Sequence, residues 1–427
     1  MLSAQENETL TRVGPDTPMG RMMRRFWFPV ATSAQLPAPD CAPLRVSLLG
    51  ESLVVFRDTS GAVGVLEELC MHRCVSLALG RVEKGGIRCL YHGWKFAVDG
   101  TVLDTPNNTN LRFRDRLRAP AFPVREAGGL IWAYIGPKDK QPELPGYSFL
   151  GGPDENRVVV RLNTPCNYLQ LFEGGVDSSH VGILHSNSAN PTWMDDTFTP
   201  VTDEDYNPGA LSSADNAPLL EVEDTAFGFH YAARRRGPAA RDGSPTHSIR
   251  VTPALLPVTR VIPAPAYQFW VFEVPASDVA TSTYLIAHGS KPIDRASILR
   301  VLGLRAPLWD ERTCDFRASW AGGMGQDRSR LASSWTGYDG IEQEDAVLAI
   351  TMGAILDRTR EHMVAADRAV IHLRRRLLDS VERHEAGGDP IGLGVDVAAV
   401  RSLADTVIAP DDPWQALVPA NVAAGRA

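Results

Sequence analysis

The sequence predicts an α+β protein of two domains, an all-β domain followed by a larger domain of mixed helices and strands. Three observations support this prediction. The chain has 427 residues, which is too long for one small hydrophobic core. Residues 43–137 form a series of short strand-like runs, and from residue 156 the pattern changes to helices and longer strands. A Pro-rich, charged stretch, GPKDKQPELPG, separates the two patterns.

We place the first domain at residues 43–140. Residues 44–58 contain two apolar runs around Gly50-Glu51, and an Asp99-Gly100 turn joins two alternating runs further on. Asp-Gly between alternating apolar residues is a strong hairpin signal. We expect residues 1–42 to form an N-terminal segment that packs on the second domain.

The second domain is predicted at residues 150–427. Its first element, residues 167–185, has helical spacing, and residues 247–276 read as strands. A long helical region follows at residues 342–384, with a possible bend at Gly353. The second domain is therefore expected to combine helices with a sheet.

Composition argues against several classes of function. Lys and Arg number 43 and Asp and Glu 51, a net charge of −8, which disfavours binding to nucleic acid or to an anionic membrane surface. The N-terminus lacks a secretory signal, and the most apolar window, residues 253–275, is interrupted by prolines and Arg260. We expect a soluble, cytoplasmic protein that binds neither nucleic acid nor membrane.

The cysteines are concentrated where metal ligands are expected. Three of the six lie within one short stretch, which is typical of ligands in a reducing compartment rather than of a disulfide framework. This stretch contains two Cys/His pairs, Cys70-Met-His72 and Cys89-Leu-Tyr-His92. A structural zinc site is the commonest use of two Cys and two His. One Cys and one His in each loop, however, suits a two-iron cluster with two thiolates on one iron and two imidazoles on the other.

At these residues the chain resembles the Rieske [2Fe–2S] domain, with its Cys-x-His and Cys-x-x-His pairs. The resemblance implies that Cys70, His72, Cys89 and His92 hold the cluster. The Rieske subunits of respiratory complexes carry a flanking disulfide, but here Tyr91 precedes His92, so Cys74 has no local partner. The lack of this disulfide suggests a lower potential within the Rieske range, as suits an electron donor to oxygen chemistry.

A second metal site is predicted in the helical segment 167–185. On a continuous helix, Glu173, Asp177 and His180 share one face, whereas His185 would point away unless Gly182 bends the helix. Two imidazoles and one carboxylate form the facial triad of non-haem iron oxygenases. Isolated helical histidines are more often packing or solvated residues.

The stretch EGGVDSSHVGILH resembles the iron-binding signature of the Rieske non-haem iron aromatic ring-hydroxylating oxygenases, in their alpha (oxygenase) subunit. The resemblance implies that His180 and His185 bind a mononuclear Fe(II). It also implies that Asp177 bridges an iron-ligand histidine to the Rieske residue His92 of a neighbouring subunit. The second domain is then a helix-grip-like catalytic domain with an antiparallel sheet and helices.

The third iron ligand is predicted near the start of the helical region 342–384. The stretch GIEQEDAVLAITMG resembles the phthalate 4,5-dioxygenase branch, in which an aspartate after a Gln binds iron. This chain has Gln343-Glu344-Asp345 where the family has Gln-Asp. The spacing to Met352-Gly353 favours Asp345, with Glu344 as the alternative. An acidic residue at a helix start is also favoured by the helix dipole alone.

The resemblance covers nearly the whole chain and implies an oxygenase that uses O₂ and electrons from a separate flavin and iron–sulfur reductase. The subunits would form a homotrimer or stacked trimers, in which the cluster of one subunit faces the iron of the next. The reaction would be dihydroxylation or O-demethylation of an aromatic carboxylate such as a phthalate or methoxybenzoate. A Rieske electron carrier and a zinc-stabilised module without oxygenase activity are the alternatives.

An aromatic carboxylate requires a cationic partner, and arginine matches a carboxylate bidentately. Five arginines flank or lie within the predicted strands of the second domain: Arg234, Arg235, Arg236, Arg250 and Arg260. We prefer Arg250, because it lies mid-strand among apolar neighbours. A surface arginine is the ordinary alternative for each of them.

Overall fold

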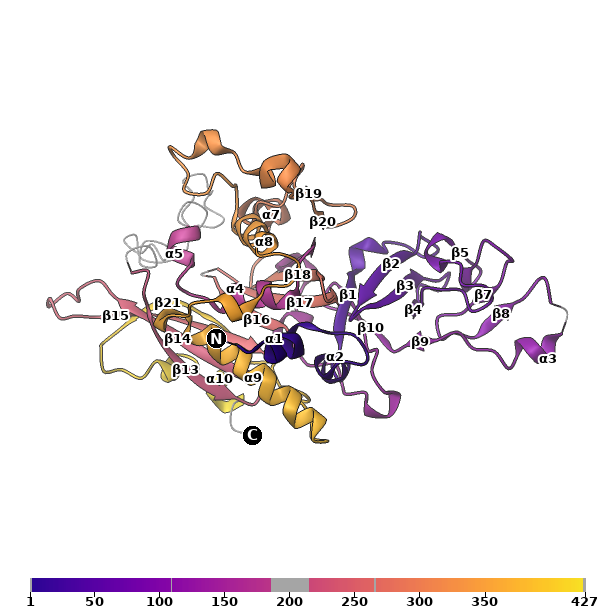
Figure 1. The fold of residues 1–427 in the computed structure, drawn as a ribbon, viewed down its shortest axis with the longest axis horizontal. Helices are drawn as coiled ribbons and strands as arrows, with labels where there is room; N and C mark the ends of the chain where they lie inside the picture. Colours follow the sequence, from indigo (N-terminus) through magenta and orange to yellow (C-terminus); the bar gives the residue numbers. More distant parts are fainter. Residues whose placement is uncertain (1, 109, 186–214, 265, 425–427) are drawn as a thin grey trace. The chain divides into compact units, whose positions relative to one another are not determined.

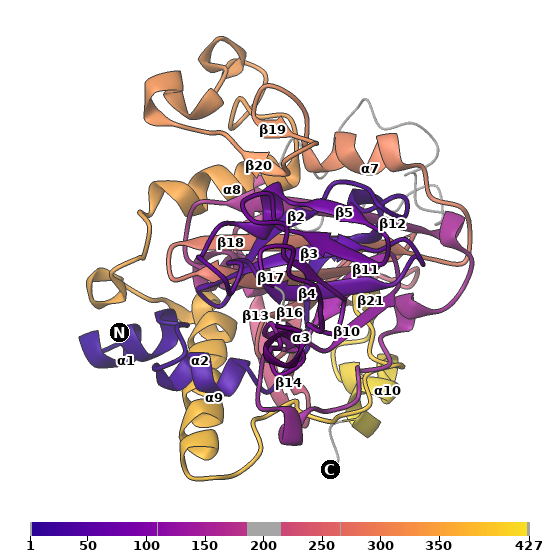
Figure 2. The same cartoon turned by 90° about the vertical axis from the view of Figure 1, so that its right-hand side faces the viewer.

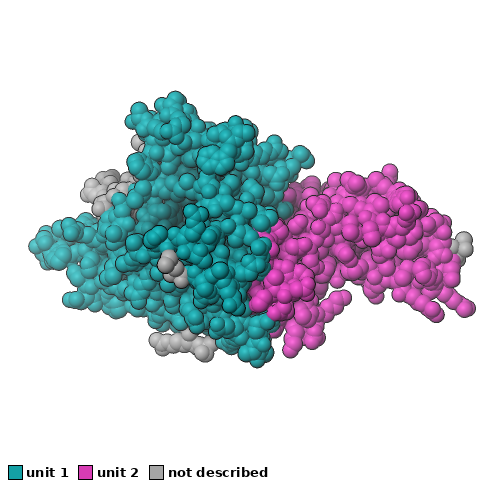
Figure 3. Space-filling model, viewed as in Figure 1, with its two compact units in different colours: residues 1–12, 145–273, 279–427 teal, residues 13–144, 274–278 magenta. Residues whose placement is uncertain are grey.

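The computed structural model describes residues 2–108, 110–185, 215–264 and 266–424. By their internal contacts these residues form two compact units (Figure 3). Unit 1 comprises residues 1–12, 145–273 and 279–427, and unit 2 comprises residues 13–144 and 274–278. We describe each unit by itself.

Unit 2 is built from three small antiparallel sheets (Figure 1). The first sheet has β1 (Phe28–Thr32), β11 (Leu130–Ala133) and β10 (Val124–Ala127). The second has β2 (Leu44–Leu48), β3 (Glu51–Arg57), β4 (Val63–Glu67) and β9 (Ala121–Phe122). The third has β5 (Arg81–Glu83), β6 (Gly86–Arg88), β7 (Lys95–Phe96) and β8 (Val102–Asp104). Short helices complete the unit: α2 (Pro18–Met23), α3 (Leu111–Arg114), η1 (Ser33–Gln35), η2 (Leu77–Leu79) and η3 (Lys138–Lys140).

The predicted Asp99-Gly100 turn joins β7 and β8. Gly100 has a φ of +83°, a left-handed conformation that glycine adopts without steric cost. A Cβ at Gly100 would also overlap the carbonyl oxygen of Ala119. The glycine is thus required both by the turn and by the close approach of the neighbouring backbone.

The segment 1–42 is divided between the two units. Residues 13–42 belong to unit 2, where β1 pairs with β11 and the buried guanidinium of Arg24 binds Glu51 with an Nη2–Oε1 distance of 2.6 Å. Only residues 1–12 belong to unit 1, in which Asn167 donates from Nδ2 to the carbonyl of Thr11. The predicted packing of the N-terminal segment 1–42 on the second domain remains a prediction. The predicted domain limits, 43–140 and 150–427, remain a prediction.

Unit 1 is built on one large sheet, which has ten strands among the described residues. Among the described residues, its strands pair antiparallel, except that β12 and β20 pair parallel. In spatial order the strands are β13 (Leu219–Thr225), β14 (Gly228–Arg236), β15 (His247–Leu255), β16 (Thr259–Pro263), β17 (Gln268–Ser277), β18 (Ala280–His288), β12 (Arg157–Thr164), β20 (Asp315–Phe316) and β19 (Trp309–Asp310), with β21 (Leu403–Ile408) pairing with β15.

Within the described residues, the α-helices of unit 1 are α1 (Ala4–Thr11), α4 (Tyr168–Val176), α5 (Val181–Leu184), α7 (Arg295–Leu302), α8 (Ile341–Thr351), α9 (Arg368–Glu385) and α10 (Pro419–Ala424). Its 3-10 helices are η4 (Ser148–Leu150), η5 (Asp154–Asn156), η6 (Trp320–Gly325), η7 (Arg328–Arg330), η8 (Arg358–Arg360), η9 (Ala365–Asp367) and η10 (Trp414–Leu417). The helical region predicted at 342–384, with a possible bend at Gly353, is thus two helices, α8 and α9, and the chain between them contains only short 3-10 turns.

Alternate residues of β14 show which elements cover each face of the sheet, because successive strand side chains point to opposite faces. The ring of Phe229 lies 5.0 Å from that of His372 on α9. The ring of His230 lies 4.8 Å from that of Trp414, in the C-terminal segment. Helix α9 and the C-terminal segment therefore cover opposite faces, as Figure 2 shows for α9 and α10. Among the described residues, none of the helices has the length and apolar character needed to cross a membrane.

Candidate functional site

Unit 2 brings the two predicted Cys/His pairs together. Cys70 and Cys89 are both buried within a cluster of apolar side chains. The rings of His72 and His92 meet edge to face, with their centroids 4.5 Å apart. Trp94 stacks on His72 with a centroid distance of 4.7 Å and an interplanar angle of 4°. The arrangement places two sulfurs inside and two imidazoles at the margin.

The chemistry of this group fits a two-iron cluster. Burial raises the pKa of the Cys70 thiol to about 11, so a thiolate there requires a positive partner. Nδ1 of His92 is buried without a hydrogen-bond partner among the described residues, which is costly for a ring nitrogen unless an ion satisfies it. Two thiolates and two ring nitrogens are the Rieske ligand set.

In unit 1, helix α4 ends where the predicted site begins. The backbone of Asp177 is extended, with φ −90° and ψ 110°, and the short helix α5 begins after His180. The predicted continuous helix with a bend at Gly182 is therefore wrong. The chain instead breaks at residues 177–179, and the break turns His180 and His185 toward one point.

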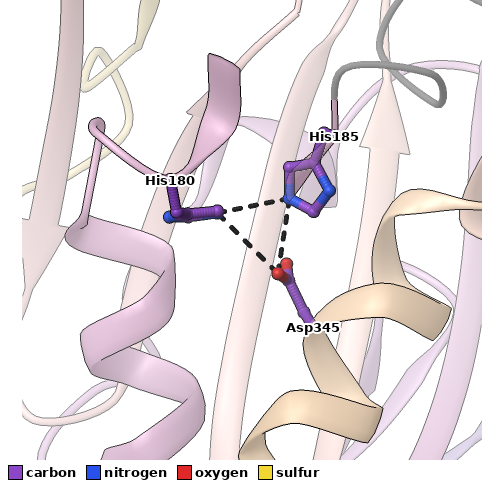
Figure 4. Close-up of side chains that lie close together, drawn as sticks. All are labelled: His180, His185 and Asp345. Carbon is purple, nitrogen blue, oxygen red and sulfur yellow. Dashed lines mark hydrogen bonds and ion pairs between the residues drawn. The ribbon is translucent and has the colours of Figure 1, made fainter. Parts of the chain in front are cut away.

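Three potential ligand atoms converge at this point, as Figure 4 shows. Nε2 of His180 lies 3.2 Å from Nε2 of His185. Oδ1 of Asp345, on α8, lies 3.7 Å from the first nitrogen and 3.3 Å from the second. Two donors that bind one transition-metal ion at about 2.1 Å and at right angles would lie about 3.0 Å apart. The observed spacing thus fits one shared ion, with all three residues on the same side of that ion.

The electrostatics of the group also favour a cation. Burial opposes a charge on His185, but the facing carboxylates of Asp345 and Glu344 raise its pKa to about 10. Burial likewise opposes the charge of Asp345, but His185 and His180 hold the pKa of that carboxyl at about 2. The site therefore stabilises positive charge at the centre of the three residues.

Each histidine has a second carboxylate behind it. Nδ1 of His185 lies 2.8 Å from Oε2 of Glu344, and Nδ1 of His180 lies 3.3 Å from Oδ2 of Asp177. Burial would raise the pKa of Asp177, but hydrogen bonds from His180 and Ser179 lower it. Because a carboxylate accepts hydrogen bonds, each Nδ1 carries a proton, and each Nε2 faces the shared point, where a bound metal ion would take the place of a second proton. The sequence predicted Glu344 only as an alternative ligand, and its contact with His185 was not predicted. The adjacent Glu-Asp pair was the available signal.

One face of the large sheet contributes polar groups beside Asp177. In the antiparallel register Arg235 lies opposite Ser248, and Ala233 lies opposite Arg250, so Arg235 and Arg250 project from the same face. Tyr231, four residues before Arg235 on β14 and on the same face, has its hydroxyl 3.1 Å from Oγ of Ser178. Nη2 of Arg235 donates to the carbonyl of Ser178 at 2.7 Å.

The structure separates the five candidate arginines by their partners. Arg234 binds Glu221, and Arg260 binds Glu273 with an Nη1–Oε1 distance of 2.5 Å. Arg236 is exposed and Arg250 half-buried. Arg235 is 1% exposed, and its Nη1 has no hydrogen-bond partner among the described residues. Burial lowers its pKa, and the like charge of Arg250 contributes to this shift. Nε of Arg260 also lacks a partner among the described residues, but Arg260 is already paired with Glu273. Arg235 is thus the candidate best suited to an anionic ligand, whereas the sequence pattern favoured Arg250.

Two protein families match the chain. The family described as "Rieske [2Fe-2S] domain" matches residues 26–121. The family described as "LigXa C-terminal domain like" matches residues 133–425. The first match contains the two Cys/His pairs and the second contains the His180–His185–Asp345 group.

Curated relatives align with almost the whole chain. The chain is 35% identical to the phthalate 4,5-dioxygenase oxygenase subunit of Pseudomonas putida, over 97% of this chain and 94% of the relative. It is 34% identical to the 3-chlorobenzoate-3,4-dioxygenase oxygenase subunit of Comamonas testosteroni, over 93% of each chain. It is 29% identical to the 5,5'-dehydrodivanillate O-demethylase oxygenase subunit of a Sphingobium species, over all of this chain and 92% of the relative.

Solved structures share the fold at low sequence identity. The terminal oxygenase of carbazole 1,9a-dioxygenase from Nocardioides aromaticivorans matches with a TM-score of 0.57 and 18% identity, over 91% of this chain and 98% of that chain. Dicamba monooxygenase bound to 3,6-dichlorosalicylic acid matches with a TM-score of 0.56 and 17% identity, over 85% and 98%. Both likenesses concern the fold alone.

Proposed function

The chain belongs to the Rieske non-haem iron oxygenases, as an oxygenase subunit of the phthalate 4,5-dioxygenase-like branch, and from this premise we propose the roles of its residues. It carries a Rieske [2Fe–2S] cluster and a mononuclear iron. We assign the cluster to Cys70, His72, Cys89 and His92. We assign the mononuclear iron to His180, His185 and Asp345. The observation that carries this second assignment is the convergence of two Nε2 atoms and one carboxylate oxygen, with the His185 ring held from behind by the buried Glu344.

We propose that the substrate is an aromatic carboxylate. Relatives over more than 90% of this chain act on phthalate and on 3-chlorobenzoate, as their names state. Both compounds are aromatic carboxylates. The buried guanidinium of Arg235, whose Nη1 has no hydrogen-bond partner among the described residues, supports the same substrate class because arginine binds carboxylates in a bidentate, charge-assisted manner. Arg250 on the same sheet face adds a second positive charge.

The residues of this chain position the reactants. When bound, the ferrous ion supplies reductive activation of O₂, with electrons that arrive through the two-iron cluster. Arg235 fixes the carboxylate, and the carbonyl and hydroxyl of Ser178 hold Arg235 and Tyr231 in place. Asp177 holds the proton on Nδ1 of His180. Because His185 and Glu344 are both buried, water is excluded from the contact between Nδ1 of His185 and the Glu344 carboxylate. Dihydroxylation and O-demethylation both agree with this arrangement.

The oxygenase subunit works with a separate electron donor, which we propose to be a flavin and iron–sulfur reductase. We further propose a homotrimer, alone or stacked, in which Asp177 of one subunit meets His92 of the partner subunit. The exposure of apolar side chains next to the cluster ligands supports a contact there. These side chains are Leu69, Met71, Leu90 and Tyr91.

Metal analysis and substrate screening test the proposal together. Anaerobically purified protein is expected to contain about three Fe per chain, two in the cluster and one mononuclear. Two Fe per chain would indicate an electron carrier, and zinc a structural module. Aromatic acids are then screened with a surrogate reductase while O₂ uptake, formaldehyde and cis-diol are followed. Formaldehyde identifies a demethylase and a diol a dioxygenase. Full metallation without turnover of any aromatic acid would contradict the substrate class.

A further inference from the structure

The two iron-facing histidines differ in the partner behind each ring. The side chain of Asp177, behind His180, is 22% exposed. The side chain of Glu344, behind His185, is 1% exposed. One ring is therefore backed by a carboxylate that another protein can reach, and the other ring by a carboxylate enclosed in unit 1.

Glu344 is held by contacts on both of its oxygens. Oε1 accepts a hydrogen bond of 2.5 Å from Oγ1 of Thr336, and Oε2 lies 2.8 Å from Nδ1 of His185. Thr336 is itself fixed, because its Oγ1 also accepts from the backbone N–H of Tyr338 at 3.2 Å. Glu344 and Asp345 are neighbours on α8, yet they contact opposite nitrogens of the same imidazole.

We propose that Glu344, held by Thr336, is a positioning residue that fixes the orientation and tautomer of His185 and thereby sets the Fe(II) affinity of the mononuclear site. The inference rests on the proposed function of that site. Its basis is geometric: a ring held at Nδ1 by an enclosed carboxylate keeps Nε2 directed at the point that His180 and Asp345 share. Carboxylate partners of metal-bound histidines commonly act in this way.

The arrangement also argues that Glu344 is not itself a ligand. Both of its oxygens are already engaged, and it lies on the Nδ1 side of His185, away from the two Nε2 atoms. Glu344 and Asp177, the carboxylates on the Nδ1 sides of the two histidines, then have separate roles. Glu344 governs how tightly iron is held, whereas Asp177, which is accessible, is suited to the contact between subunits.

The test compares Fe(II) affinity in the full-length protein with its cluster intact. Glu344→Gln keeps the shape of the side chain and removes its charge, and Thr336→Val keeps the carboxylate and removes its hydroxyl partner. Thr351→Val is the matched control, because Thr351 lies on α8 but is exposed and bonds only to the carbonyl of Leu348 among the described contacts. Affinity is measured anaerobically by competition with a chromophoric chelator, and the iron that remains is probed by the EPR spectrum of its nitric oxide adduct.

We expect Glu344→Gln to weaken Fe(II) binding about 10- to 100-fold, Thr336→Val to weaken it less, and Thr351→Val to leave it unchanged. The visible spectrum of the cluster should be unaltered in all three, and the EPR signal of the adduct should change in Glu344→Gln. Unchanged affinity in Glu344→Gln overturns the inference, as does lost affinity with an unaltered adduct spectrum. Wild-type protein that binds no iron beyond its cluster would instead overturn the proposed function.

Discussion

Gly175 of α4 lies directly against the guanidinium of Arg260 on β16, and a Cβ at position 175 would overlap Nε and Cδ of that arginine. Arg260 is buried and paired with the buried carboxylate of Glu273. Gly175→Ala should therefore displace Arg260 and lower the free energy of unfolding by about 1–3 kcal/mol, the usual cost of overpacking. The melting temperature of the iron-free protein measures the effect.

The preceding residue provides the control for this prediction. Gly174 is in the same helix, and a Cβ there would meet nothing within 4 Å. Gly174→Ala should be neutral or stabilise the protein by up to about 1 kcal/mol, because alanine is the better helix former. Equal melting temperatures for the two variants would show that the Gly175–Arg260 contact has no energetic weight.

Asp177→Asn is expected to retain both metals and to lose most turnover. Asparagine keeps the size of the side chain but removes the charge that faces Nδ1 of His180 at 3.3 Å, and with it the proposed link to the partner subunit's His92. Iron content, the Rieske spectrum and the rate of single-turnover electron transfer are measured together. Wild-type turnover in a fully metallated variant would eliminate the bridging role.

Arg235→Gln is expected to reduce kcat/KM for an aromatic carboxylate about 10- to 100-fold, since hydrogen bonds to charged groups contribute about 1.5–3 kcal/mol. The loss should be specific to the carboxylate, so a neutral amide analogue of the substrate should be affected much less. Arg250→Gln, on the same sheet face but half-buried, should have a smaller effect. If Arg250→Gln has the larger effect, the anchor is Arg250, as the sequence suggested.

Arg358→Met should destabilise the protein by about 3–5 kcal/mol, because it leaves the buried carboxylate of Glu173 short of one partner. Arg358 is 0% exposed and binds Glu173 with an Nη2–Oε2 distance of 2.8 Å. Arg375→Met is the control: its pair with Asp379 on α9 is largely exposed, and such pairs contribute only about 0.3–0.5 kcal/mol. The thermal midpoints of the two variants are compared, and similar midpoints would refute the larger destabilisation expected for Arg358→Met.

Much of the candidate site could be predicted because the types of its potential ligands and their local spacing follow from covalent order. The Cys70–His72 and Cys89–His92 pairs each lie within one loop, and His180 and His185 lie within one short segment. The strand-rich character of unit 2 and the Asp99-Gly100 turn were also local signals. The prediction of a continuous helix over residues 167–185 also rested on a local signal, and it failed. The helix breaks at Asp177 because the carboxylate accepts hydrogen bonds from the backbone and hydroxyl of Ser179.

The sequence by itself determined which residue types are available for two metal centres and the order in which the chain supplies them. Only the tertiary structure decided which of two adjacent acids, Glu344 or Asp345, faces both histidines, and left Nη1 of the buried Arg235 without a hydrogen-bond partner among the described residues. The physical reason is that these outcomes depend on contacts between α4, α8 and the large sheet, across more than 150 residues in the case of His185 and Glu344. Hydrogen bonds and burial between residues so far apart in the sequence are set by tertiary packing, and a local sequence pattern does not predict that packing.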